Sequence, residues 1–270
     1  MSRDLQQICA KMRRDCITMA DAAGSTGLHF GGSLSLIEIV ATLYLDVMNI
    51  NKDKLADPYR DRLILSKGHG VPAVYAVLHQ MGVISYEELG TFKTDDTRLY
   101  GHPCMNPDLG IEMSSGSLGQ GLSQGVGMAL ALRYQGNNAS RVFVILGDGE
   151  CDEGSVWEAA MSATKFQLNN LVAIVDKNQI QYDGETETVM PLQQFEDKWR
   201  SFGWEVLIID GHDLEQCHKA FSTKSTKPIV VIANTVKGKG ISFMESVPAW
   251  HHATMNKAQR EQAREELGND

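Results

Sequence analysis

The stretch VFVILGDGE, residues 142–150, decides the fold of this chain. It joins five consecutive apolar residues to a Gly-Asp-Gly turn, and a run that is apolar on both faces is typical of a strand buried inside a parallel sheet. The stretch LVAIVDKNQ, residues 171–179, repeats the pattern. Shorter strand-sized runs occur at residues 63–65, 206–209 and 229–233. The sequence therefore predicts a sheet made largely of buried parallel strands.

Segments of helical apolar spacing separate these strands. Helices are expected from Leu5 to a stop at Gly24, over 34–48, 71–81 and 116–134, from Ser155, near Leu192, after Asp213 and, as a charged tail, from Asn256. Residues 100–115 have little periodicity and are expected to form a long loop. Strands that alternate with helices predict one α/β domain over residues 1–270, with a doubly wound, mostly parallel sheet covered by helices on both faces.

Composition excludes several classes of protein. The 270 residues carry a net charge of −9 with no basic stripe, which argues against a nucleic-acid partner. The five cysteines show no C-x-x-C spacing, which argues against a zinc knuckle or a disulfide framework. The longest apolar runs are strand-sized and the first residues lack the apolar segment of a signal peptide, so we expect a cytoplasmic protein without a membrane partner.

Polar side chains follow two of the predicted strands at the point where each strand ends. Asp148 comes directly after the first run, and Asn178 follows the next one thirty residues later. Because ligands of such sheets bind at the carboxyl ends of the strands, both oxygens are expected to reach one cation, with the carbonyl of Ile180 as a third ligand. Gly-Asp-Gly alone is more often a tight turn than a site. The pair of strand-end residues is what predicts a metal–diphosphate site for Mg²⁺, or for Ca²⁺ or Mn²⁺.

The residues that follow resemble a known family. Gly-Asp-Gly followed some thirty residues later by Asn is similar to the metal–diphosphate motif of the thiamine-diphosphate enzymes, and within that superfamily the chain resembles transketolase from its first helix to about His251. The further matching segments are 66–70 (SKGHG), 101–103 (GHP), 115–121 (SGSLGQG), 237–240 (KGKG) and 250–251 (WH). Each segment is weak alone, but their order along the chain is specific.

This resemblance implies roles for individual residues. It implies that His69, Gly149, Asn178 and His251 bind the diphosphate side of thiamine diphosphate, that Gly116, Ser117 and Leu118 bind its middle, and that Asp148, Asn178 and Ile180 bind the metal. It implies catalytic roles in proton transfer at sugar hydroxyls for His29, His69, His102 and His251, because a histidine donates or accepts a proton at modest cost near neutral pH. Glu153 matches a glutamate that links paired cofactor sites; its alternative role is an ordinary first-turn glutamate. The other histidines, His79, His212, His218 and His252, are interpreted as ordinary surface or core residues.

Three places depart from the family pattern. The run before His29 is about two residues longer than usual, Cys104-Met105 follows the Gly-His-Pro segment, and His252-Ala253 stands where a glycine is expected. These departures leave room for a different substrate preference.

The resemblance also implies a partner. A whole transketolase continues with a domain that binds the cofactor's pyrimidine, so we expect that domain on a separate C-terminal subunit, in an α2β2 assembly that transfers a two-carbon ketol unit between sugars or sugar phosphates. Three alternatives stay open: the α subunit of a 2-oxoacid dehydrogenase, a relative of deoxyxylulose-phosphate synthase, and a non-catalytic cofactor-binding subunit.

Overall fold

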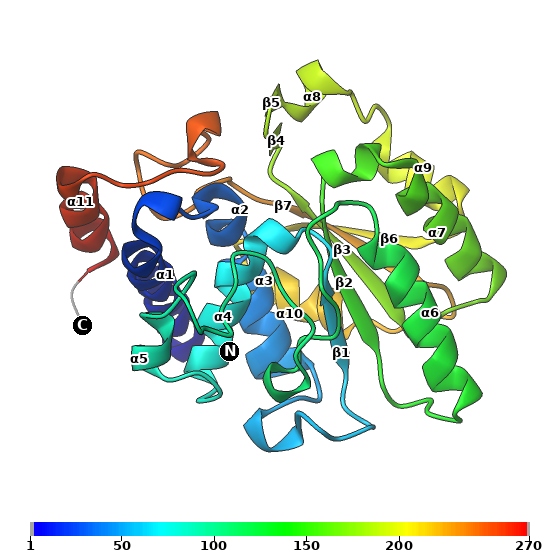
Figure 1. Ribbon diagram of the computed structural model, residues 1–270. Helices are drawn as coiled ribbons and strands as arrows, with labels where there is room; N and C mark the ends of the chain where they lie inside the picture. Colours follow the sequence, from blue (N-terminus) through cyan, green and yellow to red (C-terminus); the bar gives the residue numbers. More distant parts are fainter. Residues whose placement is uncertain (1–2, 269–270) are drawn as a thin grey trace.

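A five-stranded parallel sheet forms the centre of the molecule. The computed structural model describes residues 3–268, and its sheet has the order β1-β2-β3-β7-β6 (Figure 1). The strands are β1 (Arg62–Leu65), β2 (Val142–Gly147), β3 (Leu171–Lys177), β6 (Glu205–Asp210) and β7 (Ile229–Asn234). Every pairing in this sheet is parallel. All the predicted strands are confirmed, because their continuous apolar runs can be buried only in a sheet covered on both sides.

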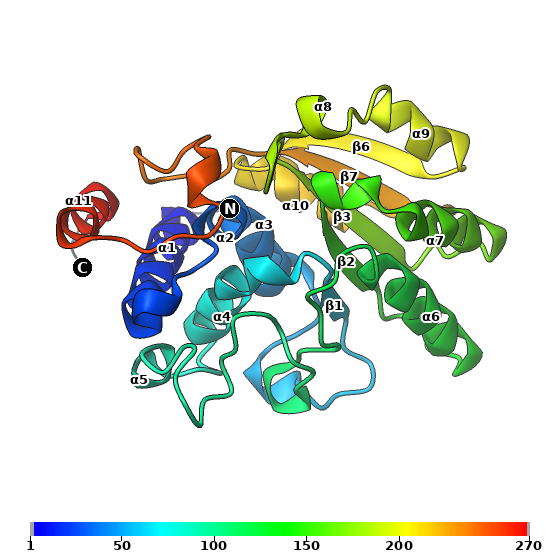
Figure 2. The same cartoon turned by 45° about the horizontal axis from the view of Figure 1, so that its top comes forward.

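Helices cover both faces of the sheet, as predicted. One face packs against α1 (Arg3–Ala23), α3 (Ile37–Thr42), α4 (Val71–Gln80) and α10 (Leu214–Ser222); the other packs against α6 (Gly121–Tyr134), α7 (Gly154–Lys165) and α9 (Phe195–Ser201) (Figure 2). Each face of the sheet forms its own hydrophobic core with the helices that cover it. Alternate residues of β2 point into the two cores: Phe143 and Ile145 lie in the first, and Val144 and Leu146 lie in the second. This alternation follows from the two-residue period of a strand.

Short elements complete the fold. Helix α2 (Phe30–Leu34) and helix α5 (Tyr86–Leu89) flank the first layer, and α11 (Lys257–Leu267) lies against α1 at its outer side (Figure 1). Beyond β3 the chain forms an antiparallel pair, β4 (Ile180–Gln181) with β5 (Gly184–Glu185), and then α8 (Thr186–Val189). The sequence did not predict this hairpin, because its strands are only two residues long.

Two predicted helices differ from the structure. The helix expected from Gly116 begins only at Gly121, because Gly119 adopts a φ of 80°, which a right-handed helix cannot contain. The helix expected over 34–48 is divided: α2 ends at Leu34, α3 follows, and the last turn at Leu43–Val47 is a π-helix in which Met48 N–H donates to the Leu43 carbonyl at 2.8 Å. Apolar spacing alone does not report such changes in winding.

Among residues 3–268, one segment is long and apolar enough to cross a membrane by length and composition. It runs over Phe30–Val47, and 83% of it is buried inside the domain. Its apolar surface is therefore covered by protein, as in a core helix. It spans α2, α3 and the π-helical turn rather than one regular helix.

Candidate active site

The register of β2 and β3 brings the predicted metal ligands to one edge of the sheet. Gly147 pairs with Asp176, so Asp148 and Asn178 leave adjacent strand ends. One carboxylate oxygen of Asp148 accepts from the Gln179 N–H at 2.6 Å, and the other accepts from the Gly149 N–H at 2.9 Å. Both side chains are buried. Helix α7 lies between β2 and β3 in the sequence and returns the chain to the same end of the sheet. Because the two strands are parallel neighbours, the residues that follow them lie side by side.

The turn that contains Asn178 and Ile180 is contacted by the side-chain ammonium of Lys237. Gln179 has a φ of 65°, and the side-chain oxygen of Asn178 accepts from the Ile180 N–H at 3.2 Å. The Ile180 carbonyl accepts from the Lys237 ammonium at 2.6 Å, and that ammonium also lies 2.9 Å from Nδ1 of His251. Burial, reinforced by the charge of Lys67, lowers the pKa of Lys237 to about 8.

The donor set fits a divalent cation that brings further oxygens with it. Within residues 3–268 no group of three His, Cys, Asp or Glu side chains is arranged to hold a metal ion. The oxygens of Asp148, Asn178 and Ile180 include one carboxylate only, and Mg²⁺ takes about six oxygens in an octahedron. A cation here would therefore need oxygens from a ligand such as a diphosphate. The Ile180 carbonyl oxygen already accepts a hydrogen bond from the positively charged Lys237 ammonium, so it is oriented toward a cation.

Next to these ligands, the buried carboxylate of Asp176 accepts hydrogen bonds from residues of four segments. Asp176 is fully buried and accepts from the Lys67 ammonium, the Thr235 hydroxyl, the Ser35 hydroxyl at 2.7 Å and the Asn178 amide at 3.1 Å. Burial acts to raise the pKa of Asp176, but the charge of Lys67 and these hydrogen bonds outweigh it and hold the pKa below its ordinary value. Asp176 therefore stays charged and orients Asn178.

The same carboxylate affects its neighbour. Burial, together with the negative charge of Asp176, raises the pKa of Asp148 to about 6, although the hydrogen bonds from Gln179 and Gly149 oppose the shift. A buried carboxylate with a raised pKa gains free energy from any cation that approaches it.

A second buried carboxylate shapes the loop before α6. Glu150 accepts from the Ser66 hydroxyl, from the Gly119 N–H at 2.8 Å and from the Gly147 N–H at 3.0 Å. Ser66 in turn accepts from the Gly121 N–H at 3.0 Å. These bonds hold Gly119 and Gly121, and the predicted cofactor-binding residues 116–118 precede them in this loop rather than lying inside the helix.

Four histidines predicted from the sequence converge beside these strand ends. The ring centroid of His29 lies 5.6 Å from His69, 5.3 Å from His102 and 5.6 Å from His251, and His69 lies 5.2 Å from His251. His252, which the sequence analysis interprets as an ordinary surface or core residue, also lies beside them, with its ring centroid 4.5 Å from that of His29. We call these five side chains the histidine wall.

The wall is electrically neutral at neutral pH. Burial, followed by the neighbouring histidines and Lys93, lowers the pKa of His29 to about 3. Burial and the charge of Lys237 lower the pKa of His251 to about 4. Burial, then Lys67, places the pKa of His69 well below its ordinary value, and burial, then Lys93, lowers that of His102. Neutral rings can each donate from one nitrogen and accept at the other, which suits proton exchange with hydroxyl groups.

The remaining predicted residues border this arrangement. Gly116 lies against His102, because a Cβ built on it would be 3.8 Å from that ring. Gly149 needs to be glycine, since a Cβ there would overlap the Gln181 side chain. Glu153 is exposed at the start of α7 and touches Gly119 rather than the histidine wall.

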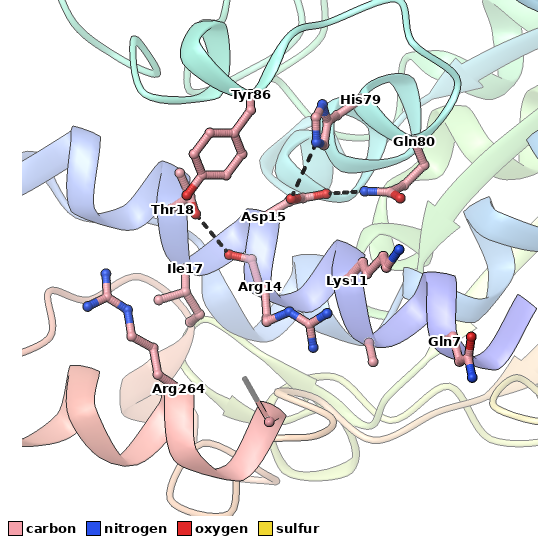
Figure 3. A pocket seen from close by; sticks show the side chains of 12 residues that line it. Gln7, Lys11, Arg14, Asp15, Ile17, Thr18, His79, Gln80, Tyr86 and Arg264 are labelled. Atoms are coloured by element: carbon pink, nitrogen blue, oxygen red, sulfur yellow. Dashed lines mark hydrogen bonds and ion pairs between the residues drawn. The ribbon is translucent and has the colours of Figure 1, made fainter. Parts of the chain in front are cut away.

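Two surface hollows differ in their relation to this site. A hollow of about 550 Å³ includes Asp148, Asn178 and Ile180 and continues along the segment after the β4–β5 hairpin. A larger one of about 930 Å³ lies between α1, α4 and α11, where Lys11, Arg14 and Arg264 face it (Figure 3). The larger hollow contains none of the predicted site residues.

Comparison with known proteins agrees with this geometry. A family model described as "Transketolase, thiamine diphosphate binding domain" matches residues 6–270. The chain belongs to the transketolase family. The predicted resemblance is thereby confirmed, and thiamine-diphosphate-dependent ketol transfer is the activity of that family.

Transketolase relatives of two sizes match the chain. It is 42% identical to an apulose-4-phosphate transketolase subunit of Phocaeicola vulgatus, over 88% of this chain and 85% of the relative, and 45% identical to a 6-deoxy-6-sulfo-D-fructose transketolase subunit of a Clostridium species, over 85% and 84%. It is 35% identical to human transketolase, over 97% of this chain but 42% of that protein. The prediction of a transketolase subunit is confirmed.

Solved transketolase structures share the fold. The enzyme from Campylobacter jejuni aligns with a TM-score of 0.87 at 29% identity, over 100% of this chain and 44% of that one. The enzyme from Leishmania mexicana gives 0.89 at 28% identity, over 100% and 42%. The chain spans less than half the length of these whole transketolases.

Sequence reasoning missed the charged residues under the site. Lys67 and Lys237 lie inside segments that were quoted only as motif matches, and both are buried. Asp176 and Glu150 lie inside the stretches 171–179 and 142–150, in which no role was predicted for them. The sequence signal for a buried charge was a charged residue at the end of an otherwise apolar run. Such a residue is buried only when it has a partner, so its position indicates a buried ion pair.

Proposed function

We propose that this chain is the diphosphate-binding half of a transketolase active site. Asp148, Asn178 and the Ile180 carbonyl would hold the metal ion, and His69, Gly149 and His251 would contact the diphosphate. Residues 116–118 would lie along the middle of the cofactor. The observation that carries this proposal is the convergence of His29, His69, His102 and His251 beside the ends of β2 and β3.

Each part of the chain has a definable task. When bound, thiamine diphosphate supplies the carbon nucleophile and electron sink that ketol transfer requires. The buried ammonium of Lys237 would offset part of the negative charge of a diphosphate, whereas the ammonium of Lys67 neutralises the buried Asp176 carboxylate. The neutral rings of His29 and His102 would orient the sugar and carry protons to and from its hydroxyl and carbonyl oxygens.

A partner must complete the active site under this proposal. We propose a C-terminal transketolase subunit with the pyrimidine-binding domain, in an α2β2 assembly, with this chain as one domain over residues 1–270. Glu153 is exposed at the start of α7, where it can reach a second copy and link paired cofactor sites. A cytoplasmic location fits such a metabolic enzyme.

The proposed substrates are a ketose donor and an aldose acceptor, at least one with an anionic end group. Two of the relatives are named for apulose-4-phosphate and for 6-deoxy-6-sulfo-D-fructose, which carry a phosphate and a sulfonate. These anions share a tetrahedral shape and negative charge.

The test is a ketol-transfer assay with phosphorylated and sulfonated ketoses, using this chain alone, the partner alone and both together. We expect turnover only from the pair, with Mg²⁺ and thiamine diphosphate. Turnover by the partner alone would establish instead that this chain is non-catalytic. Processing of pyruvate but of no ketose by the pair would also overturn the proposal.

A further inference from the structure

Two of the places where the sequence departs from the family pattern touch each other. The longer run before His29 forms the loop Gly24–Leu28, and His252-Ala253 lies directly against it. Leu28 N–H donates to the Ala253 carbonyl at 3.0 Å, and Ala253 N–H donates to the Leu28 carbonyl at 3.1 Å. This antiparallel bridge ends the loop immediately before His29.

The approach of the two segments leaves no room for a side chain at Gly27. A Cβ on this residue would lie 2.7 Å from the Ala253 carbonyl oxygen and 3.1 Å from Cε1 of His252. Gly27 also has a φ of 65° and a ψ of −179°, a conformation open to glycine almost alone. The loop is thus packed tightly on the segment that carries His252.

Lys93 binds the same loop through its side chain. Its ammonium donates to the Thr26 and Gly27 carbonyls, both at 2.9 Å. The apolar stem of Lys93 packs on Gly101, where an added Cβ would lie 3.3 Å from it, and Gly101 precedes His102. One side chain therefore contacts the two loops that carry His29 and His102.

The backbone conformation of Lys93 indicates that its position is fixed by the surrounding contacts. Its φ is 61°, a left-handed conformation that is strained for a non-glycine residue. The Lys93 N–H donates to the Leu99 carbonyl at 3.0 Å, which holds this turn in place. Strain of this kind persists where the surrounding contacts determine the conformation.

His252 adds a second contact with the loop. Its Cε1 would lie 3.1 Å from a Cβ built on Gly27, and its ring centroid lies 4.5 Å from that of His29. The loop before His29 is therefore contacted by both Lys93 and His252. A glycine at position 252 would remove one of these contacts and leave a gap beside His29.

We propose that Lys93 and His252 are positioning residues that clamp the loop Gly24–Leu28 and so hold His29 at the substrate channel. The clamp compensates for the extra length of this loop. The inference rests on the proposed role of His29 in the reaction. A displacement of about 1 Å at a catalytic group can cost about a hundredfold in rate.

The first test measures the loop directly. Hydrogen–deuterium exchange of the peptide that contains residues 24–29 is compared between the natural chain, Lys93→Met, Lys93→Arg and His252→Phe. Methionine keeps the stem without the ammonium, whereas arginine keeps donors for both carbonyls. We expect exchange in this peptide to rise about tenfold in Lys93→Met, to rise less in His252→Phe and to return toward the natural value in Lys93→Arg. The control Lys224→Met, an exposed lysine after α10, should change nothing.

The second test measures the consequence in the complex with the partner subunit. Lys93→Met should lower kcat/KM about tenfold to a hundredfold, mainly through kcat, with unchanged affinity for thiamine diphosphate, and Lys93→Arg should restore most of the loss. Unchanged exchange in Lys93→Met, or faster exchange with full turnover, would overturn the clamp.

The variant His29→Ala separates this inference from the proposed function. If His29→Ala lowers turnover and Lys93→Met does not, the clamp alone fails. If His29→Ala retains full turnover, the proposed role of His29 fails, and the positioning of His29 for catalysis fails with it.

Discussion

The metal-binding side of the candidate site is made by two adjacent strands, whereas its histidine wall is made by loops from distant parts of the chain. Asp148 and Asn178 follow β2 and β3, whose register is fixed by parallel hydrogen bonds. His29 and His251 are brought together where Leu28 pairs with Ala253 and where the Phe30 and Trp250 rings pack on each other. The first side is thus positioned by the sheet, and the second by contacts between loops.

This difference shows where each side is vulnerable. A strand end moves little, because its backbone is held on both sides by the ladder. A loop is held by a few side-chain contacts, so losing one of them can shift a catalytic ring. Changes under the strand ends should therefore act through charge and stability, and changes near the wall should act through position.

The largest expected effect is on the carboxylate that underlies the metal-binding side. Lys67→Met leaves the fully buried Asp176 without its ammonium partner, and breaking a buried ion pair in this way costs about 3–5 kcal/mol. Urea unfolding should show a loss of this size. The matched control is Lys177→Met, which removes a partly exposed pair with Glu196 and should cost about 0–1 kcal/mol. Equal losses in the two variants would contradict the assigned role of Lys67.

The next largest effect is on cofactor binding, which depends on the metal-binding side of the site. Asp148→Ala removes the only carboxylate of the proposed metal site, so Mg²⁺-dependent binding of thiamine diphosphate should weaken at least about a hundredfold, equivalent to about 2.7 kcal/mol. Isothermal titration calorimetry measures this affinity. Asp152→Ala, an exposed acid in the next turn, is the control and should bind normally. Unchanged affinity in Asp148→Ala would refute the metal assignment.

The smallest expected effect is a pH dependence. Burial and Asp176 raise the pKa of Asp148 to about 6, so this carboxylate takes up a proton as pH falls through that value and loses its attraction for a cation. Affinity for the cofactor with Mg²⁺ should level off about one pH unit above this pKa and should fall by up to about tenfold per pH unit below it. His251 remains neutral in this range, because its pKa is about 4. Titrations of Asp148→Asn should lack this component; an identical pH profile in that variant would contradict the prediction.

The sheet could be predicted because its signal is local. The apolar runs 142–146 and 171–175 each describe a buried strand without reference to any other residue, and the polar residues that follow them define the edge at which ligands bind. Four of the five wall histidines were identified through motif segments. The family match supports the transketolase assignment, whereas the contribution of each histidine to the reaction stays a prediction.

The remaining features depend on pairs of residues that are far apart in sequence. The partner of Asp176 is Lys67, and the donor to the Ile180 carbonyl is Lys237. No periodicity in a single sequence reports which buried charges meet. The position of His252 beside His29 could not be predicted for the same reason, because it depends on a bridge between two segments far apart in the sequence.

That bridge also has a consequence for the order of folding. β2 and β3 are joined by a single helix, so their strand ends can assemble once this short unit has left the ribosome. The Leu28–Ala253 pairing instead closes almost the whole length of the chain, and such a closure is slow and entropically costly. We therefore expect the metal-binding edge to form early during synthesis and the histidine wall to form last, when nearly all of the polypeptide is available.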